Sequence, residues 1–590
     1  VQEGSEDAFT WETLPGLQVK GKREPVNVFR LTGVKERRAI RPQVSKYALP
    51  MVGREAELGL IEQKLDLALK GKGQVIGITG EAGIGKTRLI AEAVRLAGER
   101  QVASYISECE SYGTNTSYLV WRPIWRALFE IDLAWDLADQ VNTLEQQLKR
   151  VDPALVPRLP LLGAALNLTI PDNDLTRSFD AKLRKSSLEA LLVDCRRAWT
   201  RRAPLLLVLE DCHWLDPLSH DLVEVIGRAV ADLPVTLVMA YRPPELERLQ
   251  APPLSQLAHF AEIELTEFTP QEAERLIALK LGQFVGPQAE VPHDLVERIT
   301  TRAQGNPFYI EELLNYLKDR GIDPRDTEAL EELDLPTSLH SLIISRLDQR
   351  TDSQKITLRV ASVIGRLFQA ALLWGMYPDL GTPERVKDDL EALCRVDLTR
   401  ADTPEPELAY LFKHIVTQEV AYESLPYATR AMLHEHLAQY IERAFGEALD
   451  QYVDLLAYHY EHSKNEDKKR EYLLRAGEAA QADYANAAAI EYFQRLLPLL
   501  PADEKVQVML KLGDVLQLVG DWQEADDTYQ EAMAIAEQSG DRATSAWCQT
   551  TMGKLLWKQT QYAEALEWLG RAQGVFEELG DKSGVGQVLQ

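Results

Sequence analysis

A glycine-rich loop is the segment of this chain whose residue types are best suited to hold phosphate. Residues 80–87 have the sequence GEAGIGKT, which satisfies the pattern G-x-x-x-x-G-K-[ST]. Gly80, Gly83 and Gly85 carry no Cβ, so successive backbone N–H groups can point at phosphate oxygens. The loop therefore predicts a phosphate-binding turn.

The residues that close this loop supply a charge and a metal ligand. Lys86 would neutralise the β- and γ-phosphates of a nucleotide, and Thr87 would bind Mg²⁺ through its hydroxyl. An apolar run at 74–79 precedes the loop, as in a strand, and an Ala- and Leu-rich segment follows it, as in a helix. The helix N-terminus adds partial positive charge. We therefore expect ATP or ADP with Mg²⁺ here, and Arg88 is counted among the nucleotide-binding residues.

Two adjacent carboxylates end another apolar run. In PLLLVLEDCHWLDP, five apolar residues lead to Glu210 and Asp211. We expect Glu210 to hold Mg²⁺ through water and Asp211 to polarise the attacking water. Many ATPases with such a loop have Asp first and Glu second, so the inverted order leaves the hydrolysis rate open. His213 and Trp214 follow, either beside the site or as a packed loop.

An arginine ends the next apolar run. TLVMAYRPPE places Arg242 at the carboxyl end of a predicted strand, one strand away from the carboxylates. A guanidinium there can reach a γ-phosphate. The alternative is a surface arginine at the sheet edge. Arg242 is therefore predicted, with Glu210 and Asp211, to serve hydrolysis.

The elements that must position these residues follow from the order of the apolar runs. Short apolar runs alternate with helical patterns, which predicts an α/β domain over 51–315 with a parallel sheet covered on both faces. The candidate strands are 74–79, 102–107, 205–210, 236–241 and 262–265.

The region after this domain reads as helical. Residues 316–445 contain helical patterns with one polar, hairpin-like break at 399–412, an order that fits a winged helix. A basic segment without periodicity, 34–50, is interpreted as a linker.

The C-terminal segment, 446–590, repeats. Gly477, Gly513 and Gly553 recur with a period of about 36 and then about 40 residues, as in tetratricopeptide arrays. An alanine follows each glycine after about 12 residues, and a large residue follows after about 16. Such arrays form a concave surface for partners. The alternative is three helical hairpins without a shared fold.

Bulk composition excludes several classes of protein. The chain has 590 residues, 45% of them hydrophobic, and a formal net charge of −26. Because the surface as a whole is negative, it repels nucleic acid and anionic lipid. The five cysteines show no CxxC spacing, and no apolar run is long enough to span a membrane. We expect a cytoplasmic protein, and a chain that opens without Met is expected to be a fragment.

The ordered set of motifs resembles the STAND branch of AAA-like ATPases, the signal-transduction ATPases with numerous domains. MVGRE at 51–55, the phosphate loop, LEDCHWLDP, YRPPE and GNPFYIEELL at 305–314 occur in that order. SECESYGTNTSYLVWRPIWRALFEI further resembles the form fused behind bacterial class III cyclases. The resemblance covers nearly the whole chain.

This resemblance implies further nucleotide-binding residues. In the family the VGRE segment sits by the adenine, so Val52, Gly53 and Arg54 are expected there. The G-x-P motif packs on the base and ribose, which implies the same role for Gly305 and Pro307.

The segment LFKHIVTQEVAYESL resembles the winged-helix motif whose histidine touches the β-phosphate of ADP and holds the molecule shut. His414 occupies that position. The alternative is a core histidine on an amphipathic helix.

Residues 1–33 resemble the end of a class III adenylate/guanylate cyclase domain. VKGK at 19–22 and PVNVF at 25–29 carry the match, and VNVFRL alternates as in a strand. None of the family's metal-binding aspartates is present, so this chain could not make a cyclic nucleotide by itself.

Together these features predict a regulatory ATP/ADP switch with slow ATPase activity that controls a cyclase domain in cis. The repeats would sense an unidentified protein or small-molecule ligand, and the ATP state could oligomerise. A STAND-type transcription activator with a helix-turn-helix outside this chain, and a scaffold with an inactive ATP site, are the alternatives. The sensed signal and the direction of control stay open.

Overall fold

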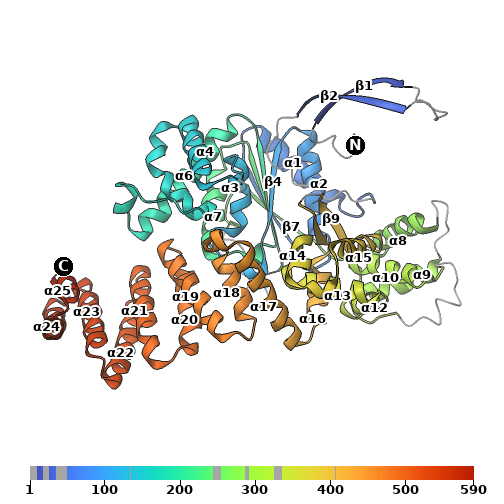
Figure 1. The fold of residues 1–590 in the computed structure, drawn as a ribbon. Coiled ribbons are helices and arrows are strands. Elements are labelled where there is room, and N and C mark those ends of the chain that lie inside the picture. Colours follow the sequence, from blue (N-terminus) through green and yellow to red (C-terminus); the bar gives the residue numbers. More distant parts are fainter. Residues whose placement is uncertain are drawn as a thin grey trace.

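The computed structural model describes residues 9–17, 26–34, 49–132, 135–243, 254–285, 292–323, 335–404 and 407–589 (Figure 1). It begins with an antiparallel pair, β1 (Phe9–Leu17) and β2 (Val26–Val34). The strand predicted from VNVFRL is therefore confirmed. The VKGK segment, Pro25 and most of the predicted linker lie outside the described residues.

The predicted parallel sheet is confirmed. Five strands lie in the order β4-β5-β6-β3-β7, and every pair of neighbours is parallel. The order places β6 between the strand of the phosphate loop and the strand of the carboxylates. The strands are β3 (Gln74–Thr79), β4 (Ala103–Glu108), β5 (Leu205–Glu210), β6 (Val235–Tyr241) and β7 (Phe260–Glu264).

Both faces of the sheet are covered, because alternate side chains of each strand point to opposite faces. On β5, Leu205, Leu207 and Leu209 join one core, whereas Leu206 and Val208 join the other. The first face packs against α3 (Arg122–Leu128), α6 (Ala181–Thr200) and α7 (Pro217–Ala229). The second packs against α1 (Glu55–Leu69) and α2 (Lys86–Glu99).

A helical insertion separates β4 from β5 and lies over the first face. Besides α3 and α6 it contains η1 (Ser111–Gly113), η2 (Leu119–Trp121), α4 (Leu137–Val151), η3 (Pro153–Leu161), α5 (Leu162–Leu166) and η4 (Thr176–Ser178). After β5 comes η5 (Cys212–Trp214). A separate helical core is formed by α8 (Pro270–Val285), α9 (His293–Ala303) and α10 (Pro307–Asp319).

The next unit combines helices with a small antiparallel sheet in the order β8-β10-β9. β9 (Thr399–Thr403) and β10 (Ala409–Phe412) form the hairpin expected at the polar break, and β8 (Leu367–Gln369) adds a third strand that was not predicted. Its helices are α12 (Leu339–Asp348), α13 (Asp352–Ile364), α14 (Ala370–Met376), η6 (Pro378–Leu380), α15 (Pro383–Arg395), α16 (Ile415–Glu423) and α17 (Tyr427–Ala444). We call it the winged-helix-like unit, residues 339–444.

Helix pairs fill the rest of the chain and form a row that ends at the C-terminus (Figure 1). None of the described helices is both long and apolar enough to cross a bilayer. The elements are η7 (Gly446–Tyr452), α18 (Val453–Glu461), α19 (Glu466–Ala482), α20 (Asn486–Leu496), η8 (Leu497–Leu499), α21 (Ala502–Val519), α22 (Trp522–Ser539), α23 (Arg542–Lys558), α24 (Tyr562–Leu579) and α25 (Lys582–Leu589).

The glycine repeat marks where paired helices approach closely. A Cβ on Gly477 of α19 would lie 2.5 Å from the ring of Phe493 on α20. A Cβ on Gly513 would lie 2.3 Å from the ring of Tyr529. A Cβ on Gly553 would lie 2.7 Å from Leu569. The recurring glycine and large residue therefore contact each other inside each helix pair.

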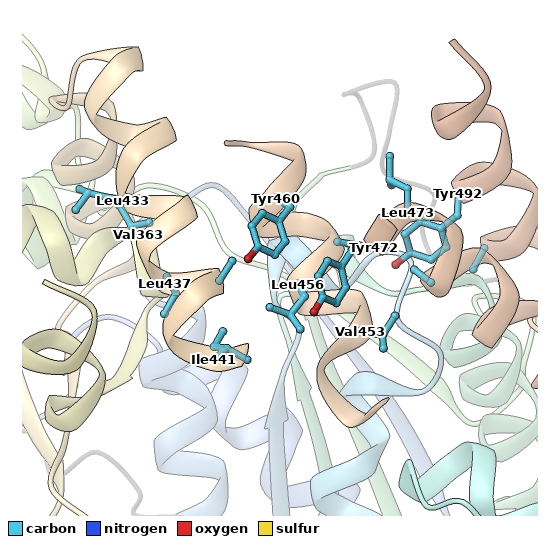
Figure 2. Close-up of a cluster of buried hydrophobic side chains, with 14 of the residues drawn as sticks. Val363, Leu433, Leu437, Ile441, Val453, Leu456, Tyr460, Tyr472, Leu473 and Tyr492 are labelled. Atoms are coloured by element: carbon cyan, nitrogen blue, oxygen red, sulfur yellow. The ribbon is translucent and has the colours of Figure 1, made fainter. Parts of the chain in front are cut away.

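One hydrophobic core joins the winged-helix-like unit to the repeats. Figure 2 shows Leu437 of α17, Leu456 and Tyr460 of α18 and Tyr472 of α19 among its side chains. The ring centroids of Tyr460 and Tyr472 are 5.2 Å apart and nearly parallel. Because the core is shared, displacement of the first repeats would disturb α17.

A test of the close approach compares the same substitution at two helical glycines. Gly477→Ala should destabilise the chain by about 1–3 kcal/mol, because the added methyl overlaps the ring of Phe493. Gly574→Ala on α24 meets no heavy atom within 4 Å, so it should be neutral or stabilising. Urea unfolding followed by circular dichroism measures both, and equal midpoints for the two variants would contradict this packing.

Candidate nucleotide-binding site

The phosphate loop has the backbone that its glycines predict. Gly80, Gly83 and Gly85 have φ values of +154°, +80° and +107°, in the region that side chains disfavour. A Cβ on Gly83 would lie 3.0 Å from Oδ1 of Asn306. Helix α2 begins directly afterwards at Lys86. The loop and the positive helix end are thus joined as anion binding requires.

Lys86 lies inside the loop. Its Nζ donates hydrogen bonds to the carbonyl oxygens of Gly80 (2.7 Å) and Glu81 (2.9 Å). Burial lowers the pKa of Lys86 to about 8, and Asp211 opposes that shift. The charges of Asp211 and, to a smaller extent, Glu210 thus favour the ammonium form of Lys86.

The predicted metal ligands meet at the sheet edge. Glu210 is the last residue of β5 and is buried, and Thr87 is close enough to act on the pKa of its carboxyl group. Burial and then the charge of Glu108 raise the pKa of Glu210 to about 7, while Arg366 and Thr87 oppose this rise. A hydroxyl and a carboxylate are oxygen ligands of the kind that Mg²⁺ prefers, so these residues fit the ion. Asp211 follows in a left-handed conformation, with φ of 52°.

Sequence reasoning missed a third carboxylate. Glu108 ends β4 and lies opposite Glu210 in the strand register. It forms an ion pair with Arg366, which lies just before β8 in the winged-helix-like unit. The predicted strand stopped at residue 107, so Glu108 fell outside it, and no local pattern marks Arg366.

Arg242 follows β6 and is positioned beside the same edge. Its guanidinium forms an ion pair with Glu419 of α16, at 3.3 Å. Its positive charge also lowers the pKa of Lys86, His213 and His414, although burial is the largest cause in each case. Arg242 thus lies near the phosphate loop and contacts the winged-helix-like unit at the same time.

His213 lies in the same charged neighbourhood. Burial, and to a smaller extent the positive charges of Arg242 and Lys86, lower its pKa to about 3. Neither ring nitrogen has a hydrogen-bond partner among the described residues, and its ring centroid is 5.1 Å from that of Trp214. The imidazole is neutral, and both of the roles considered from the sequence stay open.

The VGRE segment adjoins the phosphate loop through Arg54. Val52 is buried, and Gly53 has φ of +66°. Arg54 donates to the carbonyl oxygens of Thr266 (2.5 Å) and Ile84 (3.5 Å). The segment therefore adjoins the phosphate loop, and its predicted contact with adenine stays a prediction.

The G-x-P turn also adjoins the loop. Gly305 has φ of +75°, and Pro307 is the first residue of α10. Contact is made by their neighbours: Asn306 donates to the carbonyl oxygen of Ala82 at 3.0 Å, and the N–H of Phe308 donates to that of Gly83 at 3.3 Å. Asn306 was not predicted, because its role depends on a loop distant in the sequence.

His414 caps α16 and stacks on Phe308. The two ring centroids are 3.8 Å apart with an angle of 16°. Its Nδ1 accepts a hydrogen bond from the N–H of Val416 at 3.4 Å. Burial, and to a smaller extent the positive charges of Arg366 and Lys86, lower the pKa of His414 to about 3. In the neutral ring, Nε2 therefore carries the proton and is the remaining donor.

Arg88 is placed differently from its neighbours Lys86 and Thr87. Its guanidinium donates a hydrogen bond to the carbonyl oxygen of Leu49. This contact ties α2 to the segment before the ATPase core. A role for Arg88 in nucleotide binding stays a prediction.

Three segments of the chain match known protein families. Residues 50–239 match the AAA ATPase domain family, residues 505–578 match the tetratricopeptide repeat family, and residues 269–322 match a domain of unknown function. The first match includes the phosphate loop and Glu210, and the second includes two of the helix pairs described above.

Longer relatives are similar to most of the chain. An uncharacterized protein of Rhizobium meliloti is 28% identical over 550 residues, 90% of this chain and 51% of the relative. Adenylate cyclase type 10 of Rattus norvegicus is 20% identical over 501 residues, 75% of this chain and 30% of the relative. The chain thus spans about half of the first and under a third of the second.

Among solved structures, a STAND protein with a tetratricopeptide repeat sensor from Pyrococcus horikoshii aligns with 92% of this chain and 85% of its own, at 14% identity and a TM-score of 0.36. The family matches and the parallel sheet together confirm the predicted organisation: the chain carries an AAA-type P-loop ATPase domain followed by tetratricopeptide repeats.

Proposed function

We propose that this chain is an ATP/ADP-dependent regulatory switch of the STAND type. The observation that carries the proposal is that the winged-helix-like unit reaches the nucleotide site. His414 stacks on Phe308, whose N–H bonds to the phosphate loop, and Glu419 pairs with Arg242. Because the site lies at this joint, a change of nucleotide would change the contacts that hold the two parts together.

Each residue of the site then has a task. Lys86 and the loop N–H groups would bind the phosphates, and Thr87 with Glu210 would hold Mg²⁺, which neutralises phosphate charge when bound. Asp211 would orient the attacking water, and Arg242 would meet the γ-phosphate. Slow hydrolysis would return the site to the ADP state.

His414 would distinguish the two states. Its Nε2–H is the donor that remains once Nδ1 accepts from Val416, on a ring that stacks on Phe308. Donation to the β-phosphate of ADP would add one bond between the winged-helix-like unit and the nucleotide. In this proposal the ADP form is closed and the ATP form is open.

The repeats would pass a signal to the ATPase domain. Asn115 of the insertion donates to Glu491 of α20 at 2.9 Å, and Asn167 donates to the carbonyl oxygen of Gln451 at 3.1 Å. A partner bound to the repeats would act through these contacts and through the core shared with α17.

The output would be an adenylate or guanylate cyclase domain attached before this chain. The similarity to adenylate cyclase type 10, and the β1–β2 pair before the ATPase domain, support this proposal. In this proposal, cyclic nucleotide synthesis would be catalysed by that cyclase domain and controlled by the switch.

Nucleotide binding is tested first at the loop. Lys86→Ala should weaken ATP and ADP binding at least about tenfold, because one charge-assisted hydrogen bond contributes ~1.5–3 kcal/mol. Calorimetric titration measures the affinity, with the exposed Lys70→Ala as a matched control that should bind as wild type. Unchanged ADP affinity in Lys86→Ala would refute the assignment.

Hydrolysis is tested at Asp211. Asn tolerates the left-handed backbone of this position, so Asp211→Asn should keep the fold and the affinity while removing the charge that orients water. Single-turnover ATP hydrolysis should fall at least about 100-fold. The exposed Asp232→Asn is the control. If Asp211→Asn hydrolyses ATP at the wild-type rate, Glu210 becomes the candidate.

The closed state is tested with two substitutions of His414. His414→Leu removes the stacked ring, the Nε2–H donor and the Nδ1 acceptor that caps α16, whereas His414→Phe keeps a ring on Phe308 and removes the donor and the cap. Both should lower ADP affinity about 10- to 150-fold, as expected for one hydrogen bond to a charged group. Calorimetry and small-angle scattering, each with ADP and with a non-hydrolysable ATP analogue, measure affinity and compactness. If His414→Phe behaves as wild type, His414 serves only in packing and the proposed hydrogen bond to ADP is wrong.

A further inference from the structure

Arg366 brings a positive charge from the winged-helix-like unit to the carboxylates of the ATPase sheet. Its carbonyl oxygen accepts a hydrogen bond from the N–H of Phe412, at 2.9 Å, so the small sheet holds its backbone. Its side chain pairs with Glu108, which lies opposite Glu210 in the strand register. The ion pair therefore joins two residues that are 258 positions apart in the sequence and belong to different units.

The charge of Arg366 reaches further than Glu108. Glu210 and Asp211 also act on the guanidinium, and against the cost of burial these carboxylates hold the pKa of Arg366 above its usual value. Arg366 in turn opposes the raised pKa of Glu108, Glu110 and Glu210. Its Nε is buried without a hydrogen-bond partner among the described residues. Arg366 is thus the counter-charge of the carboxylates at the ends of β4 and β5.

We propose that Arg366 is a lock whose guanidinium holds the winged-helix-like unit on the ATPase sheet, and that Mg²⁺ entering with nucleotide weakens it. The proposal deepens the switch proposed above and rests on it. Glu210, the expected Mg²⁺ residue, is among the carboxylates that Arg366 now balances. A divalent cation placed there satisfies the same carboxylates and repels the guanidinium.

The lock and the metal are then coupled in both directions. If Mg²⁺ weakens the hold of Arg366, thermodynamic linkage requires that Arg366 weakens the binding of Mg²⁺ by the same factor. Removing the guanidinium should therefore tighten Mg²⁺, although it breaks an ion pair. An arginine that only stabilises the fold would have no such effect.

The experiment uses the full chain with Arg366→Gln, Arg366→Lys and Glu108→Gln. Both Gln variants break the same ion pair, but they change the charge beside the metal in opposite directions. Mg²⁺ is titrated into the ADP complex with a fluorescent ADP analogue as the probe, and compactness is followed by small-angle scattering. Arg346→Gln is the matched control, since Arg346 is a buried arginine paired with Glu312 and Asp319.

We expect Arg366→Gln to raise the apparent Mg²⁺ affinity about tenfold, a modest value for one partly screened charge. Glu108→Gln should lower this affinity, while both variants loosen the molecule. Arg366→Lys keeps the charge and should retain most of the wild-type behaviour. Arg346→Gln should lower the melting temperature with unchanged Mg²⁺ affinity.

Three results would overturn the lock. Unchanged Mg²⁺ affinity in Arg366→Gln would leave only a structural ion pair. Equal shifts in Arg366→Gln and Glu108→Gln would show that loosening, not charge, alters the metal site. Weaker ADP binding in Arg366→Gln with and without Mg²⁺ would make Arg366 a phosphate ligand. A different result would separate the two proposals. If the wild type is equally compact with ADP and with the ATP analogue, while the Mg²⁺ affinities of the variants differ as expected, the proposed switch is wrong and the charge coupling between Arg366 and the metal site is supported.

Discussion

The structure depends on the burial of opposite charges at one edge of a parallel sheet. Because all five strands run in the same direction, the residues after β3, β4, β5 and β6 meet at their carboxyl ends. Four charged side chains come to this edge from four different strands or the loops that follow them: Lys86, Glu108, Glu210 and Arg242. Burial of one such group alone would be costly, so each requires a partner.

The partners come largely from outside the ATPase sheet. Arg366 neutralises Glu108, and Glu419 pairs with Arg242, and both belong to the winged-helix-like unit. His414 of the same unit stacks on Phe308, which bonds to the phosphate loop. The candidate nucleotide site and the joint between the units therefore share the same contacts. A charged ligand at this edge has to change the balance that holds the units together.

The C-terminal repeats are tied to this joint by packing. Their first helices share a hydrophobic core with α17, and Tyr458 of α18 lies with its ring centroid 5.9 Å from that of Tyr112 in the insertion. Close-packed interiors transmit displacement because they contain little free space. The repeats thus contact the winged-helix-like unit through α17 and the ATPase domain through the insertion.

The sequence by itself determined the features that depend on neighbours in the chain. The phosphate loop, the carboxylates after β5, the parallel strands and the glycine period of the repeats all follow from local pattern, and the structure places them as predicted. Only the tertiary structure decided which distant groups complete the site. Asn306 reaches Ala82 across 224 residues, and Arg242 reaches Glu419 across 177. Such pairs depend on how whole elements pack, and no periodicity of the chain encodes that packing.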